Sequence, residues 1–480
     1  MLFKSFLDSP CGFRFMFDSL QLQSSCGRAK LLETELMTDE AKIKDCYEKL
    51  HNAYDSIYGE GKNSLAKLDT LDHRLMCLRD ITGTLARLNK DVVLDDIDLF
   101  EIKYLGLLCS SVTDMVNDLA LKDVQLPNLE SVVSILDPDG MKIESFYVYD
   151  SYSKDLGRIR TELKNLQAAE SAGKKDGATD DRIVNLVDKE QLLESKIREE
   201  LSGKLKRHSK DLYAAIDKMA ALDILLAKAQ QIKKIKLCFP QISSDGRTVY
   251  KGIFHPQIVD IYDKENVTAL SAAEKKKFVP VDIDFELEPV TIIGANMGGK
   301  TVVLKMTALN QLLFQFGFGV AAGSAIIDIK DNVMVCIGDE QNELSGLSSF
   351  AGEIRAVNQV LRSADAGERI LALIDEPART TNPIEGTALV TALLNVLKGK
   401  KLSVLITTHY NIAGDFFRRL RVNGLKEGKM DYRLQETYCG DIPHEAINIA
   451  ESLNINPQWI AEAKKELERQ KKNGCRDLDI

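Results

Sequence analysis

Proline is absent from a long part of this sequence. None occurs between Pro138 and Pro240, whereas eight of the eleven prolines lie from Pro240 onward. Because proline interrupts helices and sheet ladders, we expect a helical first half and a second half that mixes helices with strands. No apolar run reaches the ~18 residues of a membrane span. The nearest candidate, residues 312–327, contains Gln315 and three glycines, so it is better explained as a buried helix that leads into a strand, and no membrane partner is expected.

Paired cysteines and an excess of positive charge are also missing. The nine cysteines are scattered and form no C-x-x-C pair, which excludes a disulfide scaffold and a zinc finger and indicates reduced thiols. Asp8 and Pro10 interrupt the N-terminal segment where a signal peptide needs an apolar core, so we expect a cytoplasmic protein. With 63 Lys and Arg against 72 Asp and Glu, the formal charge is -9, and any contact with a polyanion must be local.

The first half predicts a helical lever. Apolar residues keep three- and four-residue steps from Ile183 to Ala229, which indicates one very long helix or two helices stacked end to end. Another helical stretch, residues 153–170, precedes it, and the polar run at about 170–181 predicts the tip of a hairpin. Residues 154–236 carry 19 Lys and Arg against 14 Asp and Glu. This excess of five positive charges fits either a DNA contact or an ordinary solvated helix face.

The second half predicts a parallel sheet. The runs VTIIGAN, NVMVCIG, ILALIDE and LSVLITTHY each indicate a buried strand. Since helical patterns separate them, the strands are expected to lie parallel, with helices on both faces of the sheet. We place the domain boundary near residue 237, with a helical core and lever domain in residues 1–236 and an α/β domain in residues 237–480.

A glycine-rich loop follows the first of these strands. Residues 294–301, GANMGGKT, match G-x-x-x-x-G-K-[ST] between a strand and a helical pattern, which is the context that a phosphate-binding loop requires. The glycines let backbone N–H groups face phosphate oxygens, and the helix N-terminus adds its dipole. Lys300 is then expected to bridge the terminal phosphates of a nucleotide, and the Thr301 hydroxyl to bind Mg²⁺.

Two further candidate groups lie at the ends of other strands. The run ILALI ends in Asp375 and Glu376; an Asp there can hold Mg²⁺ through water, and the following Glu can polarise an attacking water. His409 follows the run VLITT and is expected at the same edge of the sheet, where it can contact a terminal phosphate. An ordinary surface histidine is the alternative for His409.

Taken together, these motifs resemble those of the MutS family of mismatch-repair ATPases, a branch of the ABC-type P-loop fold. GANMGGKT is similar to the family's GPNMGGKS, LIDEPARTTNPIEGTAL to LIDEIGRGTSTYDGLAL, LSGLSSFAGEIRAVNQVL to LASGRSTFMVEMTETANIL, and ITTHY to FATHY. Upstream, His255 and Pro256 match an H-P pair of the family. The resemblance implies an α/β P-loop NTPase domain of ABC type with a parallel-sheet core, preceded by an all-α core and lever domain.

The resemblance also implies a role for each motif residue. Asp375 takes the metal, Glu376 acts as general base, and His409 senses the phosphate. Phe278 lies where the family stacks adenine, although a core phenylalanine is equally expected there. Ser348 reaches the partner subunit's terminal phosphate, because ABC-type dimers hold each nucleotide between two chains. The residues assigned to the nucleotide's phosphates and Mg²⁺ are Gly294, Asn296, Met297, Gly298, Gly299, Lys300 and Thr301.

ATP and Mg²⁺ are therefore the expected cofactors, and a homodimer is the expected assembly, held in part by helices at about residues 440–470. Residues 1–150 look helical and leave no room for mismatch-reading domains, and the hairpin tip is too short for a full DNA clamp. Leu347 replaces the usual signature arginine, and Pro377 and Ala378 replace the I-G that follows the strand-end carboxylates. We expect these departures to affect mismatch recognition and not ATP hydrolysis.

Two functions stay open at this point. In the first, an ATPase drives paired levers around mismatched or branched DNA. In the second, ATP turnover reactivates an adenosylcobalamin-dependent aminomutase, because PARTTNP resembles the small MutS-like ATPases associated with lysine and ornithine aminomutases. A structural dimer without ATPase activity is disfavoured, since all five polar catalytic positions are present: Lys300, Thr301, Asp375, Glu376 and His409.

Overall fold

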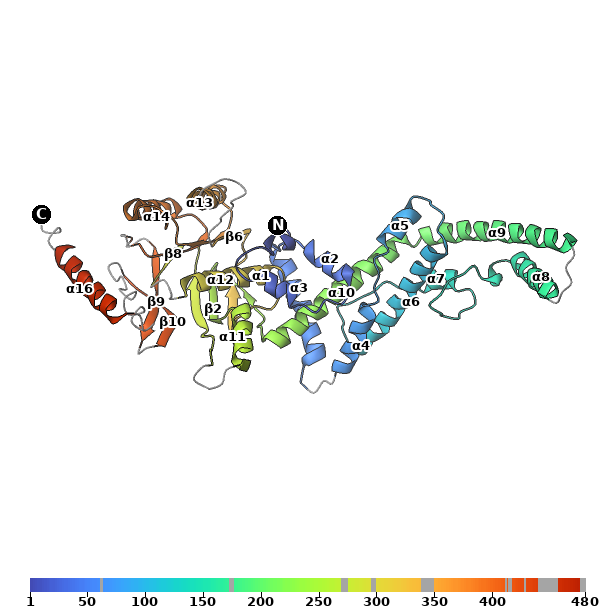
Figure 1. Cartoon of the computed structure of the whole chain (residues 1–480), viewed down its shortest axis with the longest axis horizontal. Coiled ribbons are helices and arrows are strands. Elements are labelled where there is room, and N and C mark those ends of the chain that lie inside the picture. The colour runs from blue at the N-terminus through green and yellow to red at the C-terminus, as the bar shows by residue number, and fades with distance from the viewer. Residues whose placement is uncertain are drawn as a thin grey trace. The chain divides into compact units, whose positions relative to one another are not determined.

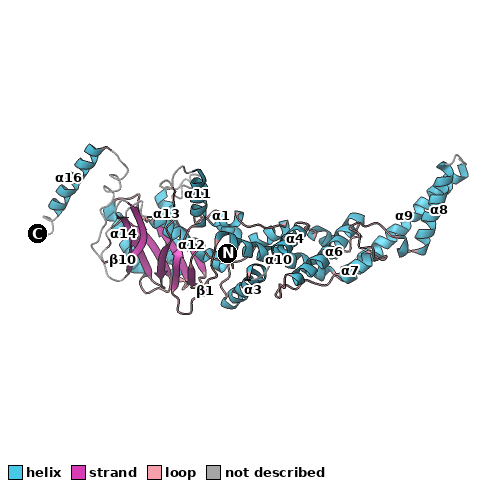
Figure 2. Ribbon diagram, turned by 90° about the horizontal axis from the view of Figure 1, so that it is seen from below, coloured by secondary structure: helices cyan, strands magenta, loops and turns pink. Residues whose placement is uncertain are grey.

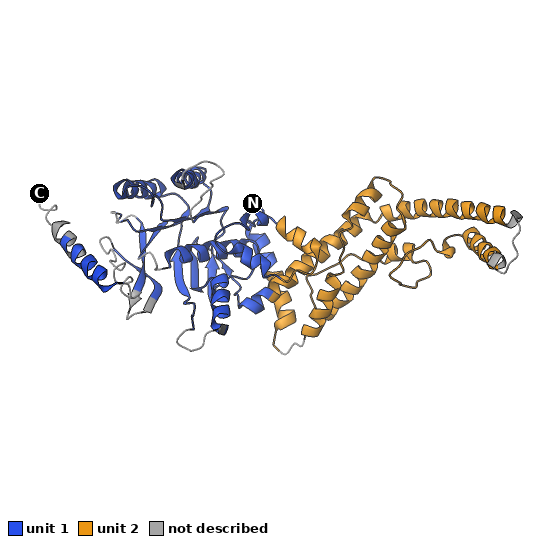
Figure 3. Ribbon diagram, viewed as in Figure 1, with its two compact units in different colours: residues 1–20, 34–47, 231–480 blue, residues 21–33, 48–230 orange. Residues whose placement is uncertain are grey.

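The computed structural model divides into two compact units (Figure 3). It describes the chain apart from residues 61–63, 172–176, 269–274, 295–298, 338–348, 411, 413–416, 427–428, 439–455 and 475–480. The first unit comprises Met1–Leu20, Thr34–Tyr47 and Gln231–Ile480, and the second comprises Gln21–Glu33 and Glu48–Gln230. The units interleave along the sequence because α3 (Glu40–Tyr58) and α10 (Ser209–Ile235) each contribute residues to both. The domain boundary that we expect near residue 237 stays a prediction.

The regular elements described in the second unit are all helices, which Figure 2 draws in cyan, and loops connect them. Besides its parts of α3 and α10, the unit contains α2 (Ser25–Leu32), α4 (Leu65–Leu75), α5 (Thr82–Asn89), α6 (Asp96–Asp118), α7 (Glu130–Leu136), η2 (Asp150–Tyr152), α8 (Lys154–Ser171) and α9 (Gly177–Lys206). Asp95 and Asp98 form a capping box that starts α6. The long apolar pattern is two helices, α9 and α10, which corresponds to the second of the two alternatives.

Ion pairs join helices α8 and α9, and Arg160 makes several of them. The guanidinium of Arg160 on α8 donates to Glu190 at 2.7 Å and to Glu194 at 2.6 Å, both on α9. It also donates to the backbone oxygen of Val148 at 2.7 Å. These contacts fix α8 against α9 near the base of the expected hairpin, whose tip at about 170–181 lies partly outside the described residues.

The first unit contains two sheets with helices around them (Figure 1). Its strands are β1 (Gln241–Ile242), β2 (Thr248–Ile253), β3 (Val281–Phe285), β4 (Pro289–Ile293), β5 (Ser324–Ile327), β6 (Asn332–Cys336), β7 (Ile370–Asp375), β8 (Ser403–Thr408), β9 (Arg418–Lys426) and β10 (Lys429–Glu436). Its helices are η1 (Phe3–Phe6), α1 (Phe13–Asp18), α11 (Pro256–Thr268), α12 (Lys300–Gln315), α13 (Ser349–Asp365), α14 (Pro383–Leu397) and α16 (Pro457–Gly474), besides parts of α3 and α10.

The larger sheet positions the candidate site. Its order is β10-β9-β4-β8-β7-β6, and all neighbours are parallel except β9 and β10. Alternate residues of β7 and β8, such as Ile374 and Ile406, pack with α13 and α14 on one face, and α12 covers the other face (Figure 1). The predicted strands and the predicted helical cover are confirmed. The smaller sheet, with order β1-β5-β2-β3, is mostly antiparallel and was not predicted.

Residues from the beginning of the chain pack against the end of α12. The ring centroid of Phe3 lies 4.6 Å from that of Phe13 and 5.0 Å from that of Phe316. The Met37 N–H donates to the Gln315 carbonyl at 3.0 Å, and the Gln315 amide donates back to the Met37 carbonyl at 2.8 Å. These contacts explain why two short N-terminal segments belong to the first unit. In residues 312–327, the buried α12 ends at Gln315 and β5 begins at Ser324, which confirms the expected helix followed by a strand.

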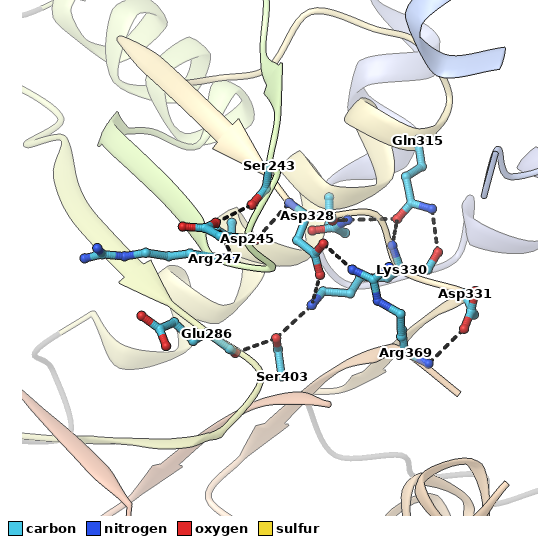
Figure 4. A network of polar contacts seen from close by, with 12 residues as sticks. Ser243, Asp245, Arg247, Glu286, Gln315, Asp328, Lys330, Asp331, Arg369 and Ser403 are labelled. Carbon is cyan, nitrogen blue, oxygen red and sulfur yellow. Dashed lines mark hydrogen bonds and ion pairs between the residues drawn. The ribbon is translucent and has the colours of Figure 1, made fainter. Parts of the chain in front are cut away.

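A buried polar network lies at the amino ends of β7 and β8 (Figure 4). The ammonium of Lys330, which is fully buried, donates to Asp328 and to Ser403, each at 2.8 Å. Arg369 also donates to Asp328, and the Ser403 hydroxyl donates to the Glu286 carbonyl at 2.7 Å. Burial lowers the pKa of Lys330. The charges of Lys330 and Arg369 are thus paired with the Asp328 carboxylate inside the network. We conclude that the network serves to join the two sheets.

The sequence led us to expect neither a membrane-spanning helix nor a disulfide scaffold, and both points can be compared with the described residues alone. None of the helices in this part of the chain combines the length and hydropathy that a membrane span needs. None of the cysteines that the structure describes forms a disulfide, and four of them, Cys11, Cys26, Cys109 and Cys238, have raised pKa values because they are buried. Buried thiols of this kind are protonated and poorly reactive.

Candidate functional site

The glycine-rich loop lies where the sequence predicts it, between β4 and α12. Gly294 follows β4 with φ of 152°, and Gly299 precedes α12 with φ of 81°. Both conformations favour glycine, because a side chain at positive φ is strained. A Cβ atom on Gly299 would also lie 3.0 Å from Cδ1 of Tyr432. The two ends of the loop therefore require glycine. Asn296, Met297 and Gly298 lie outside the described residues.

Lys300 begins α12 and is almost fully buried. Its ammonium donates to the Gly294 carbonyl at 2.7 Å and lies 3.3 Å from Oε1 of Glu376. Only 3% of the Lys300 side chain and 14% of the Glu376 side chain are exposed. Because both side chains are buried at this level, water and salt screen the attraction between them only weakly. The amine of the loop and the expected general base thus meet in one site.

Thr301 and Asp375 form the second contact between α12 and β7. The Thr301 hydroxyl donates to Oδ2 of Asp375 at 2.9 Å. A hydroxyl and a carboxylate at this spacing are suitable oxygen ligands for Mg²⁺, which usually binds one or two protein groups together with substrate phosphates and water. No group of three or more His, Cys, Asp or Glu side chains is placed to hold a metal in the described part of the chain. A metal at this site would therefore need further ligands from outside these side chains, such as water or phosphate oxygens.

Thr407 contacts the Asp375 carboxylate and the Glu376 backbone, and it was not singled out from the sequence. It lies opposite Asp375 in the parallel pair of β7 and β8. Its hydroxyl donates to Oδ1 of Asp375 at 2.5 Å and accepts the Glu376 N–H at 2.9 Å. This hydroxyl orients the Asp375 carboxylate and holds the backbone at Glu376. The signal available in the sequence was a threonine two residues before His409, at the end of a strand expected to finish at the same edge of the sheet as Asp375.

The remaining expected residues are less closely tied to the loop. His409 follows β8, is exposed, and packs its ring 4.3 Å from that of Tyr410. Phe278 is half-buried and precedes β3. Ser348 lies outside the described residues. An aromatic residue that the sequence analysis did not consider, Tyr432 on β10, lies against the loop at Gly299, and burial raises its pKa.

Fold and site together define an α/β domain in which a glycine-rich loop faces strand-end carboxylates. Residues 290–434, which include the loop, β7, β8 and most of β10, match the family model described as MutS domain V. This match and the relatives described next support membership of the MutS family.

Several curated relatives carry the name endonuclease MutS2. The one from Caldanaerobacter subterraneus is 30% identical over 286 residues, which cover 58% of this chain and 34% of the relative. The one from Halothermothrix orenii is 34% identical over 219 residues, or 45% of this chain and 25% of the relative. The one from Levilactobacillus brevis is 26% identical and covers 92% of this chain and 62% of the relative. This chain therefore spans only part of the length of these relatives.

Proposed function

We propose that this chain binds Mg-ATP and hydrolyses it to ADP and phosphate, as a P-loop ATPase of the ABC type. The observation that carries the proposal is the meeting of Lys300 and Thr301, from the start of α12, with Asp375 and Glu376, from the end of β7. This combination of a loop lysine, a hydroxyl and two carboxylates is what phosphoryl transfer to water requires.

Each group has one task in this proposal. Lys300 neutralises charge on the terminal phosphates, while Thr301 and Asp375 would hold Mg²⁺, which would supply further positive charge to the phosphates. Glu376 accepts a proton from the attacking water as its oxygen bonds to the γ-phosphorus, and the bond to the ADP oxygen breaks. The backbone N–H groups of residues 294–299 face the phosphates, and His409 contacts the γ-phosphate. Phe278 is proposed to stack on adenine, for which Tyr432 is a second candidate.

A second copy of the chain completes the nucleotide site. We propose that Ser348 of each protomer contacts the nucleotide of the other, so that ATP favours a closed homodimer and hydrolysis releases it. The helices at about 440–470 support this dimer, and the movement reaches the lever that α8 and α9 form. A chain with the ATP sites at a dimer interface couples phosphate chemistry to lever motion.

DNA is the target that we propose for the levers, with cytoplasmic action. The relatives are named as endonucleases, and residues 154–236 carry five more basic than acidic residues, 19 against 14. The comparisons do not support the alternative target, an aminomutase. The experiment is phosphate release by the full chain with and without branched DNA, at low and high salt. Stimulation that weakens with salt is expected, because phosphate contacts release counterions; an unchanged rate at both salt concentrations contradicts a DNA target.

A further inference from the structure

The loop after β7 holds two residues in a conformation that side chains disfavour. Glu376 has φ of 44° and Ala378 has φ of 62°, and neither is glycine. Residues in this left-handed region persist only where the surrounding structure fixes them, and they concentrate at functional sites. Something must therefore hold the segment that carries the Glu376 carboxylate.

Two side chains from other elements hold Ala378 on both sides of its backbone. The Ala378 N–H donates to a carboxylate oxygen of Glu353 on α13. The Ala378 carbonyl accepts the Tyr410 hydroxyl at 2.7 Å. Ala378 is itself buried, with 1% exposed, so water is not available to replace these partners. A helix and the segment after β8 thus meet at one residue, Ala378, two residues from Glu376.

The path of Tyr410 to this carbonyl depends on Gly386 in α14. A Cβ atom on Gly386 would lie 2.3 Å from the Tyr410 hydroxyl oxygen, a separation that no real side chain tolerates. The absence of a side chain at Gly386 therefore makes room for the hydroxyl. Burial raises the pKa of Tyr410, and the carboxylates of Glu353 and Glu376 add to the rise. The hydroxyl stays protonated at neutral pH and remains a donor.

We propose that Glu353 and Tyr410 are positioning residues for ATP hydrolysis: they hold Ala378 from two sides and thereby set the carboxylate of Glu376 against the attacking water. The inference rests on the proposed ATPase function. Neither residue needs to touch the nucleotide. Their loss should therefore lower kcat and leave nucleotide binding intact, because a displacement of a catalytic group by about 1 Å can cost about 100-fold in rate.

The first experiment measures kcat and KM for ATP with Glu353→Ala, Glu353→Gln and Tyr410→Phe in the full chain. We expect Glu353→Ala and Tyr410→Phe to lower kcat by about tenfold or more with KM nearly unchanged. Glu353→Gln should restore most of the rate, because its amide oxygen can still accept the Ala378 N–H. Gln359→Ala, on an exposed position of the same helix, is the matched control and should behave as the wild type.

A second measurement separates positioning from a general loss of structure. In the Glu376→Gln background, adding Tyr410→Phe should not lower kcat further, because the group that Tyr410 positions is already gone. The positioning role is overturned if Tyr410→Phe lowers kcat in the Glu376→Gln background by the same factor as in the wild type. It is also overturned if the loss of rate follows a loss of thermal stability. A wild-type kcat in Tyr410→Phe and Glu353→Ala overturns it too when the wild-type chain hydrolyses ATP. If the wild-type chain itself releases no phosphate, the proposed function fails instead, and this inference falls with it.

Discussion

The ammonium of Lys300 lies 3.3 Å from Oε1 of Glu376, so the loop amine and the expected general base are paired with each other. A terminal phosphate carries more negative charge than this one carboxylate and is the stronger partner for the amine. On the proposed function, nucleotide binding replaces the ion pair and leaves Glu376 to accept a proton from water. In this proposal, Glu376 becomes available as a proton acceptor only when a nucleotide is bound.

Lys300→Ala should lose nucleotide affinity, because the charge-assisted contact to the phosphates disappears. A contact of this kind contributes about 1.5–3 kcal/mol, or roughly 10–150-fold in Kd. The measurement is equilibrium binding of a fluorescent ATP analogue in the presence of Mg²⁺. Lys305→Ala, farther along α12, is the matched control and should keep its affinity. Undiminished binding by Lys300→Ala means that the loop is wrongly assigned.

Glu376→Gln should bind ATP yet scarcely hydrolyse it. The amide keeps the shape of the side chain but accepts no proton, and the loss of a general base typically costs about 100-fold to 10,000-fold in rate. Because ATP then persists, the variant should accumulate as a dimer in light scattering with ATP and Mg²⁺. Glu385→Gln, on α14, is the control. Normal phosphate release by Glu376→Gln contradicts the role assigned to this carboxylate.

Phe278→Ala should weaken binding of ATP more than binding of inorganic tripolyphosphate, since a stacked base contributes about 1–3 kcal/mol. If Tyr432, which lies beside Gly299 of the loop, stacks on adenine instead, Tyr432→Ala should show this loss and Phe278→Ala should not. Comparing both variants with both ligands by competition binding identifies the stacking ring. If neither variant changes the preference for ATP over tripolyphosphate, adenine is held by other groups.

Ala378→Gly should cost little stability, in contrast to alanine-to-glycine changes in helices. Alanine at φ of 62° carries strain of about 1–2 kcal/mol, which glycine relieves, while glycine adds about 0.5–1 kcal/mol of entropy loss on folding. The two effects nearly cancel. Ala392→Gly, an exposed position in α14, should cost about 1 kcal/mol. Equal destabilisation of the two variants in urea unfolding contradicts a strained Ala378.

Stability should fall in mild acid because of His255. Burial, together with the charge of Lys305, lowers the pKa of His255 from 6.5 to about 4. The unfolded chain therefore binds a proton that the folded chain refuses, and stability present above pH ~6.5 is lost as the pH falls toward 4, by up to about 3 kcal/mol. In urea unfolding at several pH values, His255→Gln should reduce this loss. The exposed His73→Gln should not, and an unchanged slope in His255→Gln contradicts the assignment.

Much of the site could be predicted from the sequence because its determinants are local. Gly294, Gly299, Lys300 and Thr301 are consecutive parts of one strand-loop-helix unit, and each glycine is required by the backbone of its own position. Likewise, Asp375 and Glu376 follow an apolar run that forms β7. Parallel strands bring their carboxyl ends to one edge of a sheet, so the meeting of the loop with these carboxylates also follows from the predicted topology.

Contacts between distant segments could not be predicted in this way. Nothing near Thr407 in the sequence shows that its hydroxyl contacts Asp375, and Tyr432 lies more than a hundred residues from Gly299. The phenylalanines of the first residues meet Phe316 only after the chain has folded. Such contacts depend on packing, and apolar and aromatic side chains have many possible partners of similar energy.

The sequence by itself determined the helical first half, the parallel strands, the glycine-rich loop and the resemblance to the MutS family, because periodicity, glycine and proline act over a few residues. Only the tertiary structure decided that N-terminal segments join the sheet-bearing unit and that Lys300 pairs with Glu376. It also decided that Glu353 and Tyr410 hold Ala378 between them. These relationships arise when buried polar groups must find partners away from water, and the partner is set by the fold as a whole.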